Sequence, residues 1–501
     1  MIADILYQCS REHDRKAWFN RRFGHGGECL RAHDGLGLGA FQRHRFRRSP
    51  SFKRVLKVAA AMAAAPDGSI PDQHKDWGDI KAAYRFLNNP KVTPEGIQST
   101  HRQQVRHLCS SHAIVLAVED GSELDYSSHR SVEGLGFVGD GIGRGLLQHS
   151  TLAVTTDGHL LGILHQIWWK RARTVEGEKR RERQARAKES DLWGDSIRAI
   201  GAVGPDTRLI HVTDRGGDCY ATMHAAYAAG QGFLIRAKHD RYVNDSTEHL
   251  WAFMERQPVK GTRTIHISAR PAKRKLPAQP ARTARLAIRY APIQVPPPRN
   301  DPRFKKPLSA WAVHVVELDP PAGVEPVEWM LLTSEPVESV DRANTCVDWY
   351  TYRWLIEEWH KAEKTGCRLE ASQLKSADAL ERLAALIAVV AVRLIQLREL
   401  AQAATDPTTP VGEPLRDQPA ALRNLVPSDW ILVVSHLAKC PQECLTPRLF
   451  WLTLAKRGGF IGRKSDGLPG WQTIWKGWAE VVLVVQGVEM HRAIIAQQSC
   501  G

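Results

Sequence analysis

Hydrophobic positions recur with a helical period in the first part of the chain. One helix is predicted over residues 52–65, and a second over residues 77–87, which ends before Pro90. Thr93 followed by Pro94 is typical of a third helix start, because threonine caps free backbone N–H groups and proline has none to satisfy. This pattern predicts a helical region at the N-terminus.

The pattern then changes to short apolar runs that predict strands. Residues 113–118 form one such run, which is soon followed by Asp120. Two further runs flank Asp157-Gly158, a strong hairpin signal. Residues 209–213 form a fourth run, directly followed by Asp214. Three antiparallel strands, a helix and another strand, with carboxylates at strand ends, predict the opening of a ribonuclease-H-like fold.

From about residue 240 to 340, short strands alternate with proline-rich, basic turns, which predicts a β-rich insertion. Helices dominate after Ser339. Near the C-terminus three tryptophans fall at positions i, i+4 and i+7 of one apolar helix face; they are Trp471, Trp475 and Trp478. The fold class expected is therefore α/β: a ribonuclease-H-like catalytic core with a β-rich insertion, flanked by α-helical N- and C-terminal domains.

The charge balance is strongly basic, with 69 Lys+Arg against 54 Asp+Glu and a formal net charge of +15. This charge suits a polyanionic partner, since cations that neutralise phosphates gain from counterion release. Taken alone, it fits a merely basic soluble enzyme equally well. No run approaches the twenty or so apolar residues of a membrane span, and the N-terminus lacks the apolar stretch of a signal peptide. The cytoplasm is the expected compartment.

Other chemical motifs are weak. The nine cysteines are scattered and odd in number, which argues against a disulfide framework. Residues 134–139 satisfy the pattern G-x-G-x-x-G, but no strand precedes them, so a dinucleotide site is not expected. One Cys/His group has metal-ligand residue types without the spacing of a zinc finger: Cys9, His13, Cys29 and His33.

The sharpest chemical signal is a charged helical segment that ends at residue 364. At about 100° per residue, five of its residues fall on one side of a single helix: Tyr350, Arg353, Glu357, Lys361 and Lys364. One carboxylate among three cations suits a phosphate backbone beside a metal ion better than it suits a hydrophobic core. The alternative is a solvent-exposed, salt-bridged helix. Trp354, Ile356 and Trp359 argue against it, because they make the remainder amphipathic, with Trp354 expected to pack.

The spacing Tyr350-x2-Arg353-x3-Glu357-x6-Lys364 resembles the Y-R-E-K signature of the IS-four group of bacterial insertion-sequence transposases, a Tn-five-like family of the DDE / ribonuclease-H-like superfamily. The resemblance to the family covers roughly residues 50–490, because other stretches also match it in the same order. These stretches are residues 82–90, 118–120, 164–169, 212–215, 236–239, 329–336 and 454–460.

This resemblance implies that Asp120, Asp214 and Glu357 form a DDE triad, as catalytic residues and metal ligands. Phosphodiester hydrolysis and strand transfer require an activated water or 3′ hydroxyl and a stabilised leaving oxygen. Two Mg²⁺ ions, for which Mn²⁺ can substitute, meet both needs and prefer carboxylate oxygens. The expected reaction is cut-and-paste transposition of an insertion sequence.

The resemblance also implies a set of DNA contacts. By resemblance to the family, Trp329 would stack on a base that is flipped out while a DNA hairpin forms at the element end. Stacking of an aromatic ring on an unpaired base is favourable. The full set expected to contact DNA is Arg54, Arg236, Lys238, Trp329, Tyr350, Arg353, Lys361 and Lys364.

Each predicted domain then has an implied role. Residues 1–100 would be a helical DNA-end-binding domain, residues 101–400 the catalytic domain with the insertion at about 240–340, and residues 401–501 a helical dimerisation domain. The expected partners are double-stranded DNA at the element ends, target DNA and a second copy of the chain in a synaptic complex, without a membrane. In a bacterial cytoplasm such a protein would associate with the nucleoid when bound to DNA.

Residues 1–50 depart from the family pattern, which suggests a frameshifted or decayed N-terminus that would impair end binding. An alternative function is therefore a catalytically idle regulator that dimerises with active copies. A nuclease of the same fold is a lesser possibility, because a plain nuclease needs no hairpin-holding residues such as Trp329. The DNA end sequence, the target preference and the activity of this copy are not encoded in any motif recognised here.

Overall fold

The computed structural model describes residues 50–498, apart from positions 75, 174–176, 178–187, 245–247, 268, 270–278, 300, 403–421, 423–425, 427 and 464–468. The atypical residues 1–49, with their Cys and His residues, lie outside the described residues, as does most of the charged segment 170–188. Among the helices that the structure describes, none combines the length and the apolar character needed to cross a membrane.

The N-terminal region is helical, as the sequence predicts. Thr93 caps the last of its helices by accepting from the N–H of Gly96, and Asp76 caps the one before by accepting from the N–H of Asp79. A short helix that the hydrophobic pattern did not predict begins at a capping box formed by Ser69 and Asp72. The four helices are α4 (Pro50–Ala64), α5 (Ile70–Gln73), α6 (Trp77–Leu87) and α7 (Pro94–Cys109).

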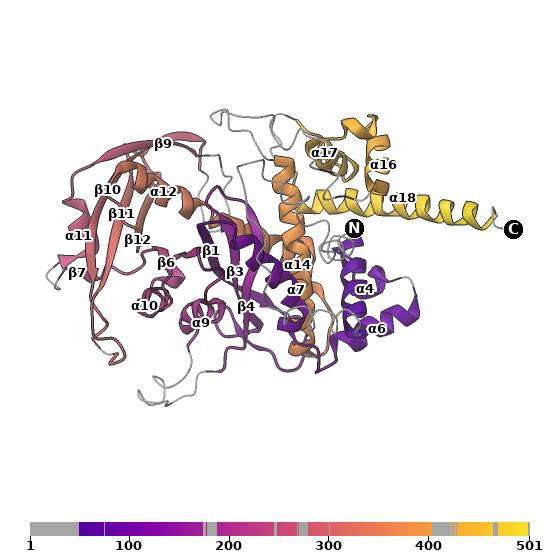
Figure 1. Ribbon diagram of the computed structural model, residues 1–501, viewed down its shortest axis with the longest axis horizontal. Helices are drawn as coiled ribbons and strands as arrows, with labels where there is room; N and C mark the ends of the chain where they lie inside the picture. Colours follow the sequence, from indigo (N-terminus) through magenta and orange to yellow (C-terminus); the bar gives the residue numbers. More distant parts are fainter. Residues whose placement is uncertain are drawn as a thin grey trace, which may run out of the picture.

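A mixed sheet forms the centre of the molecule (Figure 1). Its first strands lie in the order β4-β3-β1-β5-β6, with β3 antiparallel to both β4 and β1, and with β1, β5 and β6 parallel. This order and these directions are those of a ribonuclease-H-like fold, so the predicted fold class is confirmed. The strands are β1 (Ile114–Asp125), β3 (Gly143–Thr155), β4 (Leu160–Trp169), β5 (Arg208–Thr213) and β6 (Gly232–Arg236), and β2 (Gly136–Val138) pairs with the start of β3.

The predicted insertion continues the same sheet rather than forming a separate lobe. Its last strand, β12, pairs antiparallel with β6, and the order continues β12-β11-β10-β9 (Figure 1). Ten strands therefore share one hydrogen-bonded sheet. The added strands are β9 (Gly261–Ile267), β10 (Arg282–Val295), β11 (Leu308–Leu318) and β12 (Glu328–Thr333); a small hairpin of β7 (Tyr242–Val243) and β8 (Glu248–His249) leads into α11 (Leu250–Glu255).

Alternate residues of β1 enter different cores, because successive side chains of a strand point to opposite faces. Leu116 and Val118 join the large core that contains Ile356, whereas Val115 and Ala117 join a smaller core with Ile200. The first face is covered by α13 (Trp354–Lys361) and α14 (Ala377–Gln402), and the second by α9 (Asp191–Ile200). Beside α9 lies α10 (Tyr220–Ala228), and α12 (Val340–Thr351) precedes α13.

The C-terminal region consists of α16 (Ser428–Leu437), α17 (Pro447–Arg457) and the long α18 (Trp471–Gln498). Trp471, Trp475 and Trp478 are buried on one face of α18, which confirms the predicted apolar face. The end of α18 projects beyond α16 (Figure 1), and the far half of the helix exposes apolar side chains, among them Met490 and Ile494.

Helices α17 and α18 approach each other through glycine. A Cβ atom added to Gly477 would overlap the backbone carbonyl of Leu454, and one added to Gly458 would overlap that of Thr473. The crossing is therefore as close as backbone allows.

We expect Gly477→Ala to destabilise the protein by about 1–3 kcal/mol, because an overlap with backbone can be relieved only by moving a helix. The matched control is Gly487→Ala on the same helix, where an added Cβ meets nothing within 4 Å. Alanine favours helix there, so the control should be neutral or stabilising. Thermal unfolding measures both, and equal melting temperatures would contradict the close crossing.

His101 on α7 provides an acid-sensitive contact. Its ring is buried, and Nε2 accepts the backbone N–H of Ile163 at 3.0 Å. Burial, together with the positive charges of Arg393 and Arg102, lowers the pKa of His101 to about 3. A histidine whose pKa is lowered on folding stabilises the folded protein at pH values above its unfolded pKa of about 6.5. This contribution to stability is lost as the pH falls toward 3.

We expect His101→Gln to reduce the slope of unfolding free energy against pH between about pH 6 and 3. One such histidine contributes up to about 1.4 kcal/mol per pH unit in that window. Glutamine retains an acceptor for Ile163 but cannot take up the proton. His107→Gln, at an exposed position of the same helix, serves as the control. Denaturant unfolding at a series of pH values measures the slopes, and identical slopes for His101→Gln and wild type would contradict the assignment.

Candidate active site

Asp120 lies within β1 on the face that α13 covers. Its carboxylate is 19% exposed and accepts the backbone N–H of Gly121 at 2.8 Å. Burial raises the pKa of Asp120 to about 6, and the negative charge of Asp214 adds to the rise, while Arg353 opposes it. Asp120 is thus an acid in a site that already carries other negative charge.

Asp214 comes from the neighbouring parallel strand. Glu119 of β1 is in register with Thr213 of β5, so the next residues, Asp120 and Asp214, lie side by side at this edge of the sheet. Asp214 ends the strand and caps a single 3-10 turn, η1 (Arg215–Gly217), by accepting the N–H of Gly216 at 2.7 Å.

Glu357 lies in the first turn of α13, half-exposed, with Arg353 between it and Asp120. The Arg353 guanidinium is 3.7 Å from Asp120 Oδ2 and donates a hydrogen bond to Glu357 Oε1. The structure therefore brings the three predicted acids to one place from two strands and a helix. One arginine joins two of them.

The prediction that Tyr350, Arg353, Glu357, Lys361 and Lys364 share one face of a single helix is wrong. The helix breaks at Tyr352 and Arg353, where α12 gives way to α13 through bonds of the i to i−3 type. It changes again to a π-helical turn, η2 (Ala362–Gly366), before the 3-10 turn η3 (Leu369–Ala371). In the π turn Glu363 is buried and accepts a hydrogen bond from Gln148 at 2.9 Å, and burial raises its pKa well above the usual value.

The two lysines of the predicted face consequently point elsewhere. Lys361 is exposed and lies 3.6 Å from Glu358, its neighbour on the helix. Lys364 donates a hydrogen bond to the carbonyl of Glu123 on β1 and lies 3.8 Å from Glu370. Lys364 thus ties the π turn to β1, a role that the helical period could not reveal.

Tyr350 is buried rather than part of an open polar face. Its ring meets Trp329 edge-on, with centroids 5.5 Å apart. Burial raises the pKa of Tyr350, and its hydroxyl accepts a hydrogen bond from Arg236 and is close enough to Arg353 and Asp214 to feel their charges. Tyr350 therefore connects the acids to the insertion.

The remaining predicted DNA contacts lie in three places. Arg236 ends β6 and donates to the carbonyl of Glu328 at 3.0 Å, beside Trp329 on β12. Lys238 follows β6, with its side chain in solvent. Arg54 belongs to α4, where its guanidinium lies 3.6 Å from Asp79 of α6.

Two features near the acids were missed at the sequence level. Trp354, expected to pack, is 58% exposed and directly follows Arg353. Behind Asp120, on the other face of β1, Glu119 is fully buried between His149 and His211. Burial raises the pKa of Glu119, but the two imidazoles outweigh it, so that this pKa lies below its usual value. The alternation of a strand was the one signal that placed Glu119 opposite Asp120.

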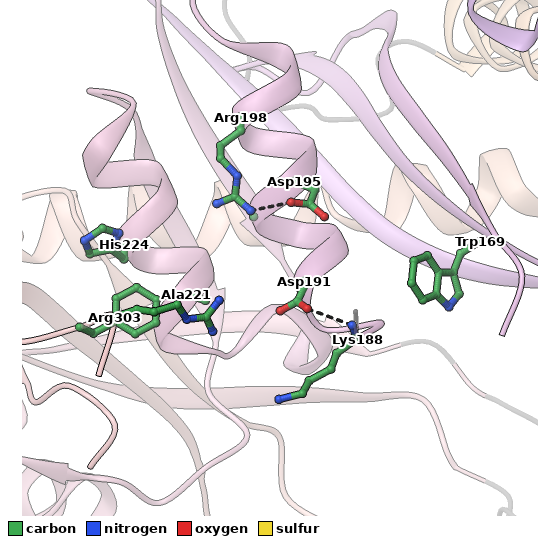
Figure 2. A pocket seen from close by; sticks show the side chains of 10 residues that line it. Trp169, Lys188, Asp191, Asp195, Arg198, Ala221, His224 and Arg303 are labelled. Atoms are coloured by element: carbon green, nitrogen blue, oxygen red, sulfur yellow. Dashed lines mark hydrogen bonds and ion pairs between the residues drawn. The ribbon is translucent and has the colours of Figure 1, made fainter. Parts of the chain in front are cut away.

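A hollow of about 230 Å³ lies elsewhere, between α9, α10 and the loop that carries Arg303 and Phe304 (Figure 2). Two of its acidic side chains have partners there: Arg198 pairs with Asp195 at 2.6 Å, and Asp191 accepts the backbone N–H of Lys188 at 2.9 Å. The predicted site residues do not line it, so it is separate from the acids.

The side chains at the predicted site can be compared with the ligands that a divalent metal ion requires. In the ranges that the structure describes, no three carboxylate, imidazole or thiolate side chains are arranged to hold a metal ion. At the predicted site the Arg353 guanidinium occupies the space between two of the carboxylates. The chemistry nevertheless fits a divalent cation, because three carboxylates offer the hard oxygen ligands that Mg²⁺ prefers. Burial, and after it the negative charge of Asp214, raises the pKa of Asp120, and a cation would offset both.

Comparison with known proteins gives matches at both ends of the chain. Residues 48–92 match a family model described as transposase DNA-binding, and residues 426–497 match the transposase Tn5 dimerisation domain. Among solved structures, the chain is similar to a piggyBac transposase synaptic complex with hairpin DNA, at 10% identity and a TM-score of 0.35, covering 84% of this chain and 79% of that one.

The two family matches fall on the regions predicted to bind DNA and to dimerise, in that order. Between them lie the ribonuclease-H-like sheet, with Asp120 and Asp214, and the helix α13, with Glu357. At its two ends the chain therefore resembles Tn5-like transposases, through a transposase DNA-binding domain and a Tn5 dimerisation domain.

Proposed function

We propose that this transposase is an active cut-and-paste enzyme in which Asp120, Asp214 and Glu357 bind two Mg²⁺ ions. The observation that supports this most is the meeting of the three carboxylates beside Arg353 at one edge of the sheet. When bound, the ions would activate a water or 3′ hydroxyl and stabilise the leaving oxygen.

The protein's own groups hold the DNA in this proposal. Arg353 and Arg236 would bind phosphates next to the scissile bond, because a guanidinium matches the geometry of phosphate oxygens. Tyr350 orients both, since its hydroxyl accepts from Arg236 and lies in the field of Arg353. As Arg353 moves onto a phosphate, it leaves the space between Asp120 and Glu357.

Trp329 and Trp354 would hold an unpaired base during hairpin formation. Trp329 packs on Tyr350 at the edge of the site, and Trp354 presents an exposed aromatic face next to Arg353. Aromatic faces beside a phosphate-binding group offer stacking platforms to flipped bases.

The same chain supplies DNA binding through its N-terminal helices and self-association through α18, whose far half exposes apolar side chains. The proposed active form is a homodimer bound to two element ends and then to target DNA in a bacterial cytoplasm. A catalytically idle, dimerising regulator is the alternative that the first experiment below would reveal.

We expect Asp120→Ala, Asp214→Ala and Glu357→Ala each to lower Mg²⁺-dependent cleavage by on the order of 100-fold or more, because each removes a metal ligand. The substrate is DNA that carries the inverted repeats flanking the protein's own gene, assayed with Mg²⁺ or Mn²⁺. Asp195→Ala, at the Arg198 ion pair on α9, is the control and should retain cleavage. Cleavage that survives the triad substitutions would refute the metal assignment, and a wild type that binds ends without cutting them would favour the regulator.

We expect Trp354→Ala to slow hairpin formation by about 5- to 150-fold, because this is the effect of losing the stacking of one base on an aromatic ring. Trp354→Phe should retain most of the rate, because its ring can still stack. A nick at the element end precedes the hairpin and should be nearly unaffected, which separates stacking from metal chemistry. Denaturing gels of end-labelled DNA resolve the two steps. Equal rates for the alanine and phenylalanine variants would contradict the stacking role.

A further inference from the structure

A buried polar cluster lies directly behind the proposed catalytic acids. Glu119 and Asp120 are consecutive on β1, so they point to opposite faces of the sheet. Asp120 faces α13, and Glu119 faces α9 with no exposed surface. A fully buried carboxylate is rare unless it is paired, because removing its charge from water is costly.

Glu119 is paired with imidazoles from the strands on both sides. His149 Nε2 of β3 donates to Oε2 at 3.1 Å, and His211 Nδ1 of β5 hydrogen-bonds to Oε1. The far nitrogen of His211 donates to Gln231 Oε1 at 2.6 Å, since the Gln231 amide nitrogen is itself bonded to the carbonyl of Gly201 at 2.8 Å. Every hydrogen-bonding atom of Glu119 and His211 therefore has a partner.

These bonds fix the register of three strands at the level of the acids. A shift of one residue between β1 and β5 would separate Glu119 from His211 and turn Asp120 toward the other face of the sheet. The cluster thus specifies which residue of β1 lies beside Asp214.

The cluster also reaches the turn that carries Asp214. The His149 ring meets Trp193 of α9 edge-on at 4.6 Å. Trp193 lies under Gly216, where an added Cβ would come within 3.0 Å of the indole, and Gly216 donates its N–H to Asp214. His149 therefore contacts both groups that lie against the aspartates: Glu119, which precedes Asp120, and Trp193, which packs under the turn of Asp214.

Stability alone does not account for such a cluster. Buried ion pairs are often no more stabilising than apolar residues of the same size, and their best-attested use is to specify a register. Here the register matters because Asp120 and Asp214 repel each other and must nevertheless stay adjacent.

We propose that Glu119, together with His149 and His211, is a positioning residue that holds Asp120 and Asp214 at the separation required to bind the divalent metal pair. This rests on the proposed function. Groups that orient metal ligands through hydrogen bonds typically contribute 10- to 100-fold to metal affinity.

The test compares two buried carboxylates. Glu119→Gln removes an acceptor from the cluster behind the acids. Glu317→Gln is the matched control, because Glu317 is also buried and bonded to Arg282 at 2.9 Å, but it lies on β11 in the insertion. Binding of Mn²⁺ alone to the full chain is followed by the electron paramagnetic resonance signal of free Mn²⁺, alongside thermal unfolding and cleavage kinetics.

We expect Glu119→Gln to weaken Mn²⁺ binding by about 10- to 100-fold and to lower kcat, with KM for DNA unchanged. Glu317→Gln should lower the melting temperature but leave Mn²⁺ affinity at the wild-type value. His149→Gln, which leaves the Glu119–His211 pair intact, gives a milder variant should Glu119→Gln fail to fold, and it should weaken Mn²⁺ binding in the same direction.

Three outcomes are decisive. Wild-type Mn²⁺ affinity in a folded Glu119→Gln or His149→Gln variant, while Asp120→Ala loses binding, overturns the positioning role and leaves the proposed function standing. Equal losses of affinity in Glu119→Gln and Glu317→Gln would reduce the effect to general destabilisation and also overturn it. If Asp120→Ala binds Mn²⁺ like the wild type, the proposed function fails, and the positioning role fails with it.

Discussion

Repulsion between carboxylates is the constraint on which the centre of this molecule depends. Parallel pairing of β1 with β5 sets Asp120 beside Asp214, and α13 adds Glu357. Burial and the negative charge of Asp214 raise the pKa of Asp120, and like charges this close remain together only if the surrounding structure holds them. Two sets of contacts hold the carboxylates together, one on each face of β1. In front, the Arg353 guanidinium joins Asp120 to Glu357. Behind, the hydrogen bonds of Glu119 lock the strands themselves.

The insertion shares this rigidity because it continues the sheet. Pairing of β12 with β6 sets Leu331 opposite Arg236, so Trp329 and Arg236 reach the acids from adjacent strands. Tyr350 fills the space between these strands and α13, with its ring on Trp329 and its hydroxyl on Arg236. Arg236 and Trp329, which are proposed to contact DNA, therefore have backbone positions fixed by main-chain hydrogen bonds. A tethered lobe would allow them to drift relative to the acids.

Features set by local chemistry were predictable from the sequence. The cap at Thr93, the ends of α6 and the tryptophan face of α18 follow from neighbouring residues alone. The acids were named through a resemblance, since an aspartate at a strand end has many other uses. What failed depended on distant contacts. A period of 3.6 residues treats residues 350–364 as one helix, but packing of Tyr350 on Trp329 and burial of Glu363 against Gln148 break that helix twice. The partners of Glu119 were unpredictable for the same reason, because pairing of β1 with β3 and β5 decides which histidines it meets.

Distance along the chain gives the Glu119 cluster a consequence during protein synthesis. His211 follows Glu119 by 92 residues, and Glu357 is encoded later still. While a nascent chain emerges, Glu119 lacks its second imidazole until β5 has left the ribosome, so the carboxylate stays hydrated and β1 is not yet committed to its place. A product released early by a nonsense codon carries Asp120, or Asp120 and Asp214, without the third acid. Under the proposed function, a polypeptide shorter than 357 of the 501 residues would lack one of the three proposed metal ligands.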